Sequence, residues 1–179
     1  MIENPWTTND SKVVYENPWI RVREDAVTCP DGTPGIYGVV ETPIATGVVA
    51  LNEKSEIYLV GQYRYPTATY SWEVIEGGSK SAESAIQAAK RELQEEAGIQ
   101  AEEWIQLGEV VHTSNCITNE RGYLYLARGL KEVDKRPDHT EILAIKVVPL
   151  TEAVQMVHSG EIKDAMSIIA LLRAEKYLK

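Results

Sequence analysis

A glutamate-rich segment from Gly77 to Ile99 constrains this chain more than any other part of its sequence. It reads G-x5-E-x7-R-E-L-x-E-E-x-G-I. Strong helix formers fill residues 82–97 with no interior glycine or proline, so we expect one helix there. Ser81 is the expected N-cap, and Gly98 is the expected left-handed residue that ends the helix. The segment therefore predicts a loop, a helix and a second turn.

The apolar and acidic residues of this helix fall on different stripes. Ala85, Ala89 and Leu93 recur at helical spacing, which predicts a stripe that packs on a core. Glu92 and Glu96 are four residues apart and so lie one above the other. Repulsion at this spacing costs about 0.2–0.5 kcal/mol, and a bound cation would reverse it. Clustered carboxylates suit a hard divalent cation such as Mg²⁺, which proteins use most often in phosphate chemistry.

A solvated acidic face, in which Arg91 pairs with Glu95, would account for any single glutamate here. It does not account readily for nine specified positions in one order behind a Gly-Gly loop. The segment resembles a complete Nudix box, the signature of hydrolases that split a nucleoside diphosphate linked to another moiety. The resemblance implies a pyrophosphohydrolase of the α/β class, folded as a Nudix α/β/α sandwich with a mixed sheet.

The resemblance also implies roles for the charged residues of the box. Mg²⁺, or Mn²⁺ as a substitute, would be held by the carbonyl of Glu76 and the carboxylates of Glu92 and Glu96. Glu95 would assist the metal or a water molecule. The loop would be braced against the helix by Arg91 and Glu83, the latter expected in the first helical turn.

Composition narrows the class of protein. At 179 residues, with 44% hydrophobic and 25% charged residues, the chain has the content of a soluble globular protein of about one domain. No apolar run reaches a membrane span and the N-terminus has no signal pattern, so we expect a cytoplasmic protein with no membrane partner. The net charge of −9 argues against nucleic acid as a partner.

The strand and helix signals alternate along the chain in a way that predicts a mixed sheet with helices on both faces. Residues 1–42 read as strands and are expected to form an antiparallel extension, and residues 43–179 are expected to form the catalytic domain. Beyond the box helix, a strand is predicted at residues 104–114. The last helix, from about residue 163 to 177, is interpreted as a core-packing helix without a chemical role.

The N-terminal strand block, followed by QYRYP and EGG, resembles the ADP-ribose and nucleoside diphosphate sugar pyrophosphatases. In those enzymes the N-terminal strands are exchanged between two subunits, which implies a homodimer here. Trp19 and Tyr15 would stack on the base, unless they are core anchors. Arg64 would contact the substrate phosphates or ribose, or else pair with an acidic neighbour. Glu73 would contact ribose or metal, or brace the site.

The loop after the predicted strand at 104–114 carries the candidate general base. In ADP-ribose pyrophosphatases this loop commonly has Ser-Pro-Gly, with a glutamate four residues later. Ser114 matches that pattern, Asn115 and Cys116 replace the proline and glycine, and Glu120 falls on the glutamate. The missing proline leaves the preferred base and sugar open, and Glu120 could instead be a loop residue paired with Arg121.

The function we expect is Mg²⁺-dependent hydrolysis of the pyrophosphate bond of ADP-ribose or a related nucleoside diphosphate sugar. The products would be a nucleoside monophosphate and a sugar phosphate. Water, deprotonated by Glu120 or Glu95, would attack one phosphorus while Arg64 stabilises the developing charge. The alternatives are a Nudix hydrolase of nucleoside triphosphates or dinucleoside polyphosphates, and a non-catalytic nucleotide sensor. The intact glutamates and the absence of a basic stretch argue against the sensor.

Overall fold

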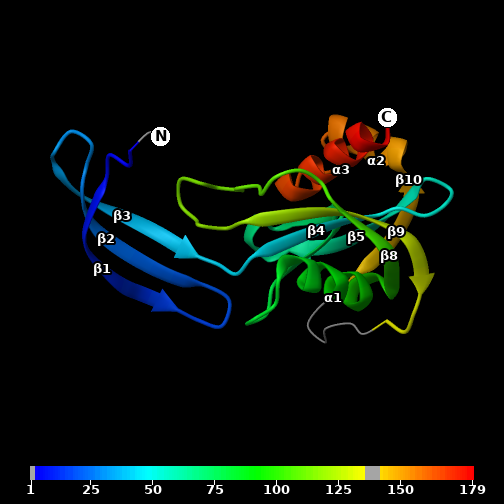
Figure 1. The fold of residues 1–179 in the computed structure, drawn as a ribbon, viewed down its shortest axis with the longest axis horizontal. Coiled ribbons are helices and arrows are strands. Elements are labelled where there is room, and N and C mark those ends of the chain that lie inside the picture. Colours follow the sequence, from blue (N-terminus) through cyan, green and yellow to red (C-terminus); the bar gives the residue numbers. More distant parts are fainter. Residues whose placement is uncertain (1–2, 136–141) are drawn as a thin grey trace. The chain divides into compact units, whose positions relative to one another are not determined.

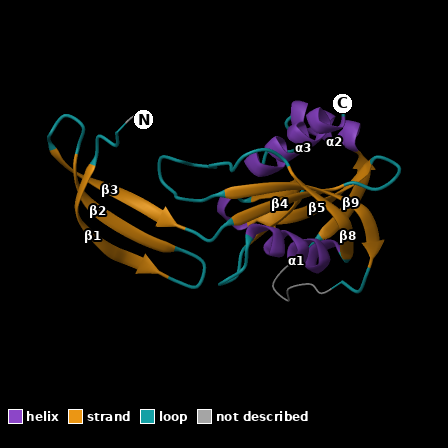
Figure 2. Ribbon diagram, viewed as in Figure 1, coloured by secondary structure: helices purple, strands orange, loops and turns teal. Residues whose placement is uncertain are grey.

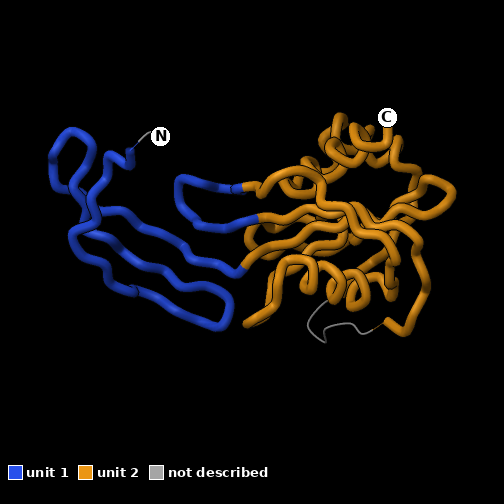
Figure 3. Tube along the Cα trace, viewed as in Figure 1, with its two compact units in different colours: residues 1–43, 112–121 blue, residues 44–111, 122–179 orange. Residues whose placement is uncertain are grey.

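The computed structural model describes residues 3–135 and 142–179, and the chain divides into two compact units. The first unit contains residues 1–43 together with the excursion 112–121, and the second contains residues 44–111 and 122–179 (Figure 3). The division places the loop that carries Glu120 with the N-terminal strands.

The first unit is an antiparallel sheet of three strands in the order β1-β2-β3. The strands are β1 (Thr7–Glu16), β2 (Arg21–Thr28) and β3 (Pro34–Glu41). The excursion 112–121 is held against β3, because the Val40 amide donates to the Ile117 carbonyl at 2.8 Å and the Asn119 amide donates to the Val40 carbonyl at 3.2 Å.

The second unit contains two sheets and the three α-helices found in the described residues (Figure 1). One sheet has the order β7-β4-β9-β8, in which β4 and β9 run parallel and the other pairs are antiparallel. The other has the antiparallel order β10-β5-β6. The strands are β4 (Ala45–Ala50), β5 (Glu56–Arg64), β6 (Thr69–Glu73), β7 (Ile75–Gly78), β8 (Ile99–Gln106), β9 (Gly122–Glu132) and β10 (Ala144–Pro149). The helices are α1 (Ala85–Ala97), α2 (Leu150–His158) and α3 (Ala165–Leu178), and a short 3-10 turn spans Tyr65–Thr67.

Alternating side chains of the central strands serve two cores. Val48 and Ala50 of β4 join a cluster with Ala89 and Leu93 of α1. Val49, between them, joins the other cluster, which contains buried residues of α2 and α3. Because successive strand residues point to opposite faces, the sheet is covered by α1 on one side and by α2 and α3 on the other (Figure 2). This confirms the expected α/β/α sandwich with a mixed sheet.

Two expected boundaries were wrong. The helix begins at Ala85, because Ala82 has a φ of +67°, a left-handed conformation that a right-handed helix cannot include. Ser84 is therefore the N-cap instead of Ser81, and its amide donates to the side chain of Gln87 at 2.9 Å. Glu83 consequently lies before the helix and outside its first turn.

The second wrong boundary is the strand after the helix. Gly98 ends α1 with a φ of +66°, as expected, and the chain enters β8 at once, so this strand covers residues 99–106 in place of 104–114. Within the described ranges, no helix is long and apolar enough to cross a membrane.

Candidate active site

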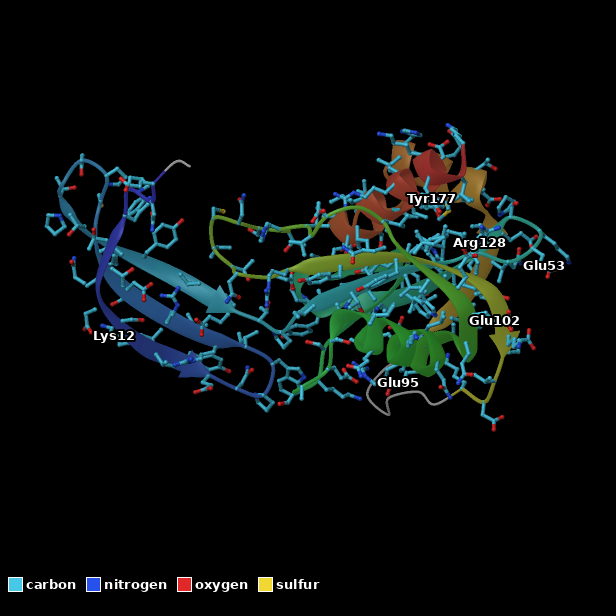
Figure 4. All side chains as sticks on the ribbon, in the orientation of Figure 1. Lys12, Glu53, Glu95, Glu102, Arg128 and Tyr177 are labelled. Atoms are coloured by element: carbon cyan, nitrogen blue, oxygen red, sulfur yellow. The ribbon has the colours of Figure 1, made fainter. Side chains whose placement is uncertain are left out.

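Arg91 connects the charged residues of the box through its hydrogen bonds. Its guanidinium group donates to both carboxylate oxygens of Glu83, from Nε at 2.9 Å and from Nη2 at 3.0 Å. Nη1 donates to Glu92 at 2.6 Å and to Glu95 at 2.7 Å, and Nη2 also donates to the Gly78 carbonyl at 2.7 Å. One arginine of α1 thus ties the loop that precedes the helix to two glutamates of the helix. Glu95 projects from the same helix (Figure 4).

The titration behaviour of this cluster follows from its hydrogen bonds. Desolvation lowers the pKa of Arg91, but hydrogen bonds to Glu83, Glu95 and Glu92 outweigh it, and the net pKa is raised. The hydrogen bond from Arg91 lowers the pKa of Glu83, and a backbone hydrogen bond from Lys80 lowers it further. Arg91 and Glu83 are therefore an ion pair at neutral pH.

Glu92 and Glu96 reach the same strand, β7. A Cβ atom at Gly77 would lie 2.0 Å from Cδ of Glu92, so only glycine leaves room for this carboxylate. Glu96 is 3% exposed, and its Oε2 accepts the amide N–H of Glu76 at 3.3 Å. The two stacked glutamates of α1 are thus packed against β7, whose Glu76 carbonyl was expected to join them as a cation ligand from a loop.

The donor set of this loop and helix fits a hard divalent cation. Glu92 and Glu96 supply ionisable oxygens beside a backbone strand, and oxygen is the ligand atom that Mg²⁺ prefers. Across residues 3–135 and 142–179, no three Asp, Glu, His or Cys side chains are already arranged as a metal cage. In this structure the glutamates of the box bond instead to Arg91 and to the amide of Glu76.

Arg64 and Glu73 form a second ion pair at the end of the β5–β6 hairpin. Nε of Arg64 donates to Oε1 and Oε2 of Glu73 at 3.0 and 3.1 Å, and Nη2 also donates to Glu73. Glu73 is 2% exposed and accepts a further hydrogen bond from Gln62 at 3.4 Å. The Arg64 side chain is 40% exposed. Glu73 is thus the buried anchor of the pair, and Arg64 is the partner that solvent reaches.

Residues of α3 complete a polar cluster that the sequence interpretation missed. The Ser167 hydroxyl donates to Oε1 of Glu76 at 2.6 Å, and the Asp164 carboxylate caps α3 by accepting the Ser167 amide at 2.7 Å. Desolvation raises the pKa of Glu76 well above its usual value, and the nearby Asp164 carboxylate raises it further. The spacing of Asp164 and Ser167 signals a cap. Their contact with β7 depends on tertiary packing, which the sequence does not reveal.

The remaining expected residues belong to the first unit. The side chains of Tyr15 and Trp19 are 55% and 74% exposed, so neither is a core anchor within this chain. The Glu120 carboxylate accepts a hydrogen bond from the Thr113 hydroxyl, and the Glu120 amide donates to the Thr118 hydroxyl at 3.1 Å. Hydrogen bonds within its own loop thus hold Glu120.

Known proteins resemble both parts of this chain. Residues 6–40 match the family model described as the nucleoside diphosphate sugar hydrolase N-terminal domain, and residues 41–168 match the NUDIX domain. An ADP-ribose pyrophosphatase of Mycobacterium tuberculosis is 32% identical over 175 residues, which cover 96% of this chain and 84% of the relative. A methanol dehydrogenase activator of Bacillus methanolicus is 28% identical over 178 residues, covering 96% of this chain and 95% of that protein.

The fold has a close counterpart among solved structures. The crystal structure of an ADP compounds hydrolase superposes with a TM-score of 0.86 and 20% identity, covering 99% of this chain and 96% of the other. At this identity the likeness establishes the fold. The family model, the relative from M. tuberculosis and the intact box together establish that the chain belongs to the Nudix family of pyrophosphohydrolases.

Proposed function

We propose that this protein hydrolyses the pyrophosphate bond of ADP-ribose or a related nucleoside diphosphate sugar in a Mg²⁺-dependent reaction. The observation that carries the proposal is the match of residues 6–40 to the N-terminal domain of nucleoside diphosphate sugar hydrolases, directly ahead of a NUDIX domain whose box keeps every glutamate. The relative from M. tuberculosis is named an ADP-ribose pyrophosphatase, which supports the same substrate class.

Glu92, Glu96 and the Glu76 carbonyl would hold the cation, with Mn²⁺ as an alternative to Mg²⁺. When bound, such an ion neutralises charge on the diphosphate oxygens and polarises water. The chain itself supplies the rigidity of the site. Arg91 fixes Glu92 through a 2.6 Å hydrogen bond, and Glu96 is fixed by the amide of Glu76 at 3.3 Å.

Arg64 is our candidate for electrostatic stabilisation of the substrate phosphates. Its bonds to the buried Glu73 hold the guanidinium group in one orientation, while 40% of the side chain stays exposed. A cation oriented in advance stabilises developing negative charge without reorganising during the reaction. We therefore assign Glu73 the task of orienting Arg64.

A carboxylate has to accept a proton from the attacking water, and Glu120 and Glu95 are the two candidates. Glu95 accepts hydrogen bonds from Arg91 at 2.7 Å and from Lys80 at 3.4 Å. These bonds engage the Glu95 carboxylate in holding the loop and helix of the box together, so we favour Glu120 as the base.

The protein is proposed to act as a homodimer in which the N-terminal strands are exchanged. All ten residues of β1 are exposed, including Val13, Val14 and Tyr15. A three-stranded sheet with one open face gains stability when apolar side chains are covered. Sedimentation velocity should give the mass of two chains, and a single-chain mass at micromolar concentration would refute the exchange. A cytoplasmic location, expected from the sequence, remains a prediction.

A substrate panel tests the proposed function. The purified protein with Mg²⁺ should release AMP and ribose 5-phosphate from ADP-ribose, and the matching products from other nucleotide sugars, faster than it hydrolyses nucleoside triphosphates or dinucleoside polyphosphates. Preference for a triphosphate would favour the alternative Nudix activity. Binding of nucleotides without turnover of any of them would favour a sensor. Chelation with EDTA should stop turnover, and added Mg²⁺ or Mn²⁺ should restore it.

A further inference from the structure

The backbone that leads into the box, from Val74 to Glu76, is held from both of its faces. From the α1 side, Glu96 accepts the amide N–H of Glu76 at 3.3 Å. From the α3 side, the Ser167 hydroxyl accepts the amide N–H of Val74 at 3.0 Å and donates to the Glu76 carboxylate at 2.6 Å. One hydroxyl group therefore joins the bend at Val74 to Glu76 of β7.

The fold places Ser167 at this spot with little freedom. Ser167 is fully buried in the first turn of α3, where its amide donates to the Asp164 cap at 2.7 Å. The neighbouring residue, Met166, packs over Gly47, where an added Cβ would lie 3.5 Å from Cε of Met166 and 2.9 Å from a methyl carbon of Leu124. The close approach of α3 to the sheet thus brings the hydroxyl within reach of β7.

We propose that Ser167 is a positioning residue for the divalent-cation site, acting through Val74 and Glu76 on the Glu76 carbonyl. The inference rests on the proposed function, because it takes that carbonyl as a cation ligand. Groups that bond to a ligand from outside the coordination sphere orient it, and their loss weakens metal binding or activity by about 10–100-fold. Ser167 would act in the same way but less directly, because it bonds to the Glu76 side chain and to the Val74 amide, on the side of the sheet away from α1.

Position 167 requires a side chain that both accepts and donates a hydrogen bond. Alanine would remove the hydroxyl that accepts the buried amide N–H of Val74 and that donates to the Glu76 carboxylate. Cysteine keeps the shape of serine, with a larger γ atom that is a weaker donor and acceptor. The series serine, cysteine, alanine therefore lowers hydrogen-bonding capacity step by step.

The test measures Mn²⁺ binding in the absence of substrate, by electron paramagnetic resonance, for the full chain and its variants. Ser167→Ala should raise the Mn²⁺ dissociation constant about tenfold, with Ser167→Cys between it and the parent. In turnover assays, the Mg²⁺ concentration for half-maximal rate should rise while kcat at saturating Mg²⁺ recovers. Ser159→Ala is the control, because it removes another serine hydroxyl bond, to the Met156 carbonyl at 3.2 Å, at an exposed position away from β7.

A double-mutant cycle with Glu76→Ala identifies the route of the effect. This variant keeps the backbone carbonyl and removes only the side chain that Ser167 contacts. It should itself weaken Mn²⁺ binding, and adding Ser167→Ala should then cost less than tenfold. If Ser167→Ala does not fold, Ser167→Cys and Glu76→Ala carry the test.

The outcomes separate the two proposals. A parent protein that binds no Mn²⁺ and hydrolyses no nucleotide sugar would overturn the proposed function. A parent that binds and turns over normally, with Ser167 and Glu76 variants whose Mn²⁺ affinity matches that of Ser159→Ala, would overturn the positioning role alone. Lower melting temperature with unchanged Mn²⁺ affinity would assign Ser167 a purely structural role.

Discussion

In the Nudix box the charged side chains bond to one another, whereas β1 of the N-terminal sheet leaves all ten of its residues exposed. The charged side chains of the box find hydrogen-bond partners within their own unit: Arg91 donates to three glutamates and to the Gly78 carbonyl. The N-terminal unit presents Tyr15 and Trp19 to solvent. The contrast fits the roles that we propose for the two regions: the box provides the reaction, and the sheet provides contacts with a substrate or a second copy of the chain.

The strongest test of these roles removes a cation ligand from the box. Glu96→Gln should lower kcat about 10³-fold or more at fixed Mg²⁺, because transition-state stabilisation of several kcal/mol is lost with the cation. Glu96 is buried against β7, so circular dichroism should verify that the variant is folded. Glu102→Gln, on the exposed part of β8, is the control and should keep full activity. Normal turnover by a folded Glu96→Gln would exclude the assigned ligand.

The proposed general base, Glu120, belongs to the other unit, so its replacement tests whether the reaction depends on the box alone. Glu120→Gln should lower kcat about 10²-fold, the lower end of the effect of general-base catalysis. Its Mn²⁺ affinity should match that of the parent protein, because Glu120 is not among the proposed ligands. A normal rate for Glu120→Gln together with a slow rate for Glu95→Gln would identify Glu95 of the box as the base. The reaction would then depend on the box alone.

A smaller effect is expected from the exposed aromatic residues of the sheet. Trp19→Ala should raise KM for the nucleotide sugar about 3–10-fold with little change in kcat, because lost stacking costs about 0.5–1.5 kcal/mol. Tyr177→Ala is the control, since Tyr177 is also exposed, at 56%, but lies on α3 of the second unit. Unchanged KM for Trp19→Ala would remove the base-stacking role.

The smallest effect concerns the pH dependence of stability. The folded-state pKa of Glu83 is lowered, chiefly by its hydrogen bond from Arg91, so the pair stabilises the protein above the ordinary pKa of 4.5. That contribution is lost as the pH falls through the lowered value. Glu83→Gln should therefore reduce the free energy of unfolding at neutral pH by less than about 1 kcal/mol, and by less still below pH 4.5. Urea unfolding at several pH values, with Glu53→Gln as a surface control, measures this difference; a gap that widens in acid would contradict the pair.

The sequence predicted the parts of this protein that local rules govern. The helix, its apolar stripe and its end at Gly98 follow from residues near one another in the chain. The start of the helix did not, because Ala82 adopts a left-handed backbone that no local signal requires. The strand after the helix was predicted at residues 104–114, too far along the chain. It covers residues 99–106, because it begins directly after the turn at Gly98.

Tertiary packing explains what the sequence left out of the site. Glu73 was expected either to contact ribose or metal or to brace the site, and its burial and its bonds to Arg64 depend on the β5–β6 register. Ser167 looked like an ordinary residue of a core helix, and only the approach of α3 to β7 gives it polar partners. Residues whose role depends on distant segments carry no local pattern, so a single sequence does not single them out.

The parallel pairing of β4 with β9 has a consequence for how the protein folds. Ala45 lies opposite Gly122, and the box and β5–β8 all lie between these two strands in the chain. Pairs so distant in sequence form slowly, because the loop they enclose must first be closed at an entropic cost. During refolding, helical signal from α1 should therefore appear before protection of the β4 amides from hydrogen exchange. Until β4 and β9 pair, the glutamates of α1 have no complete sheet to pack against. We therefore expect a newly synthesised chain to become active only after β9 has paired.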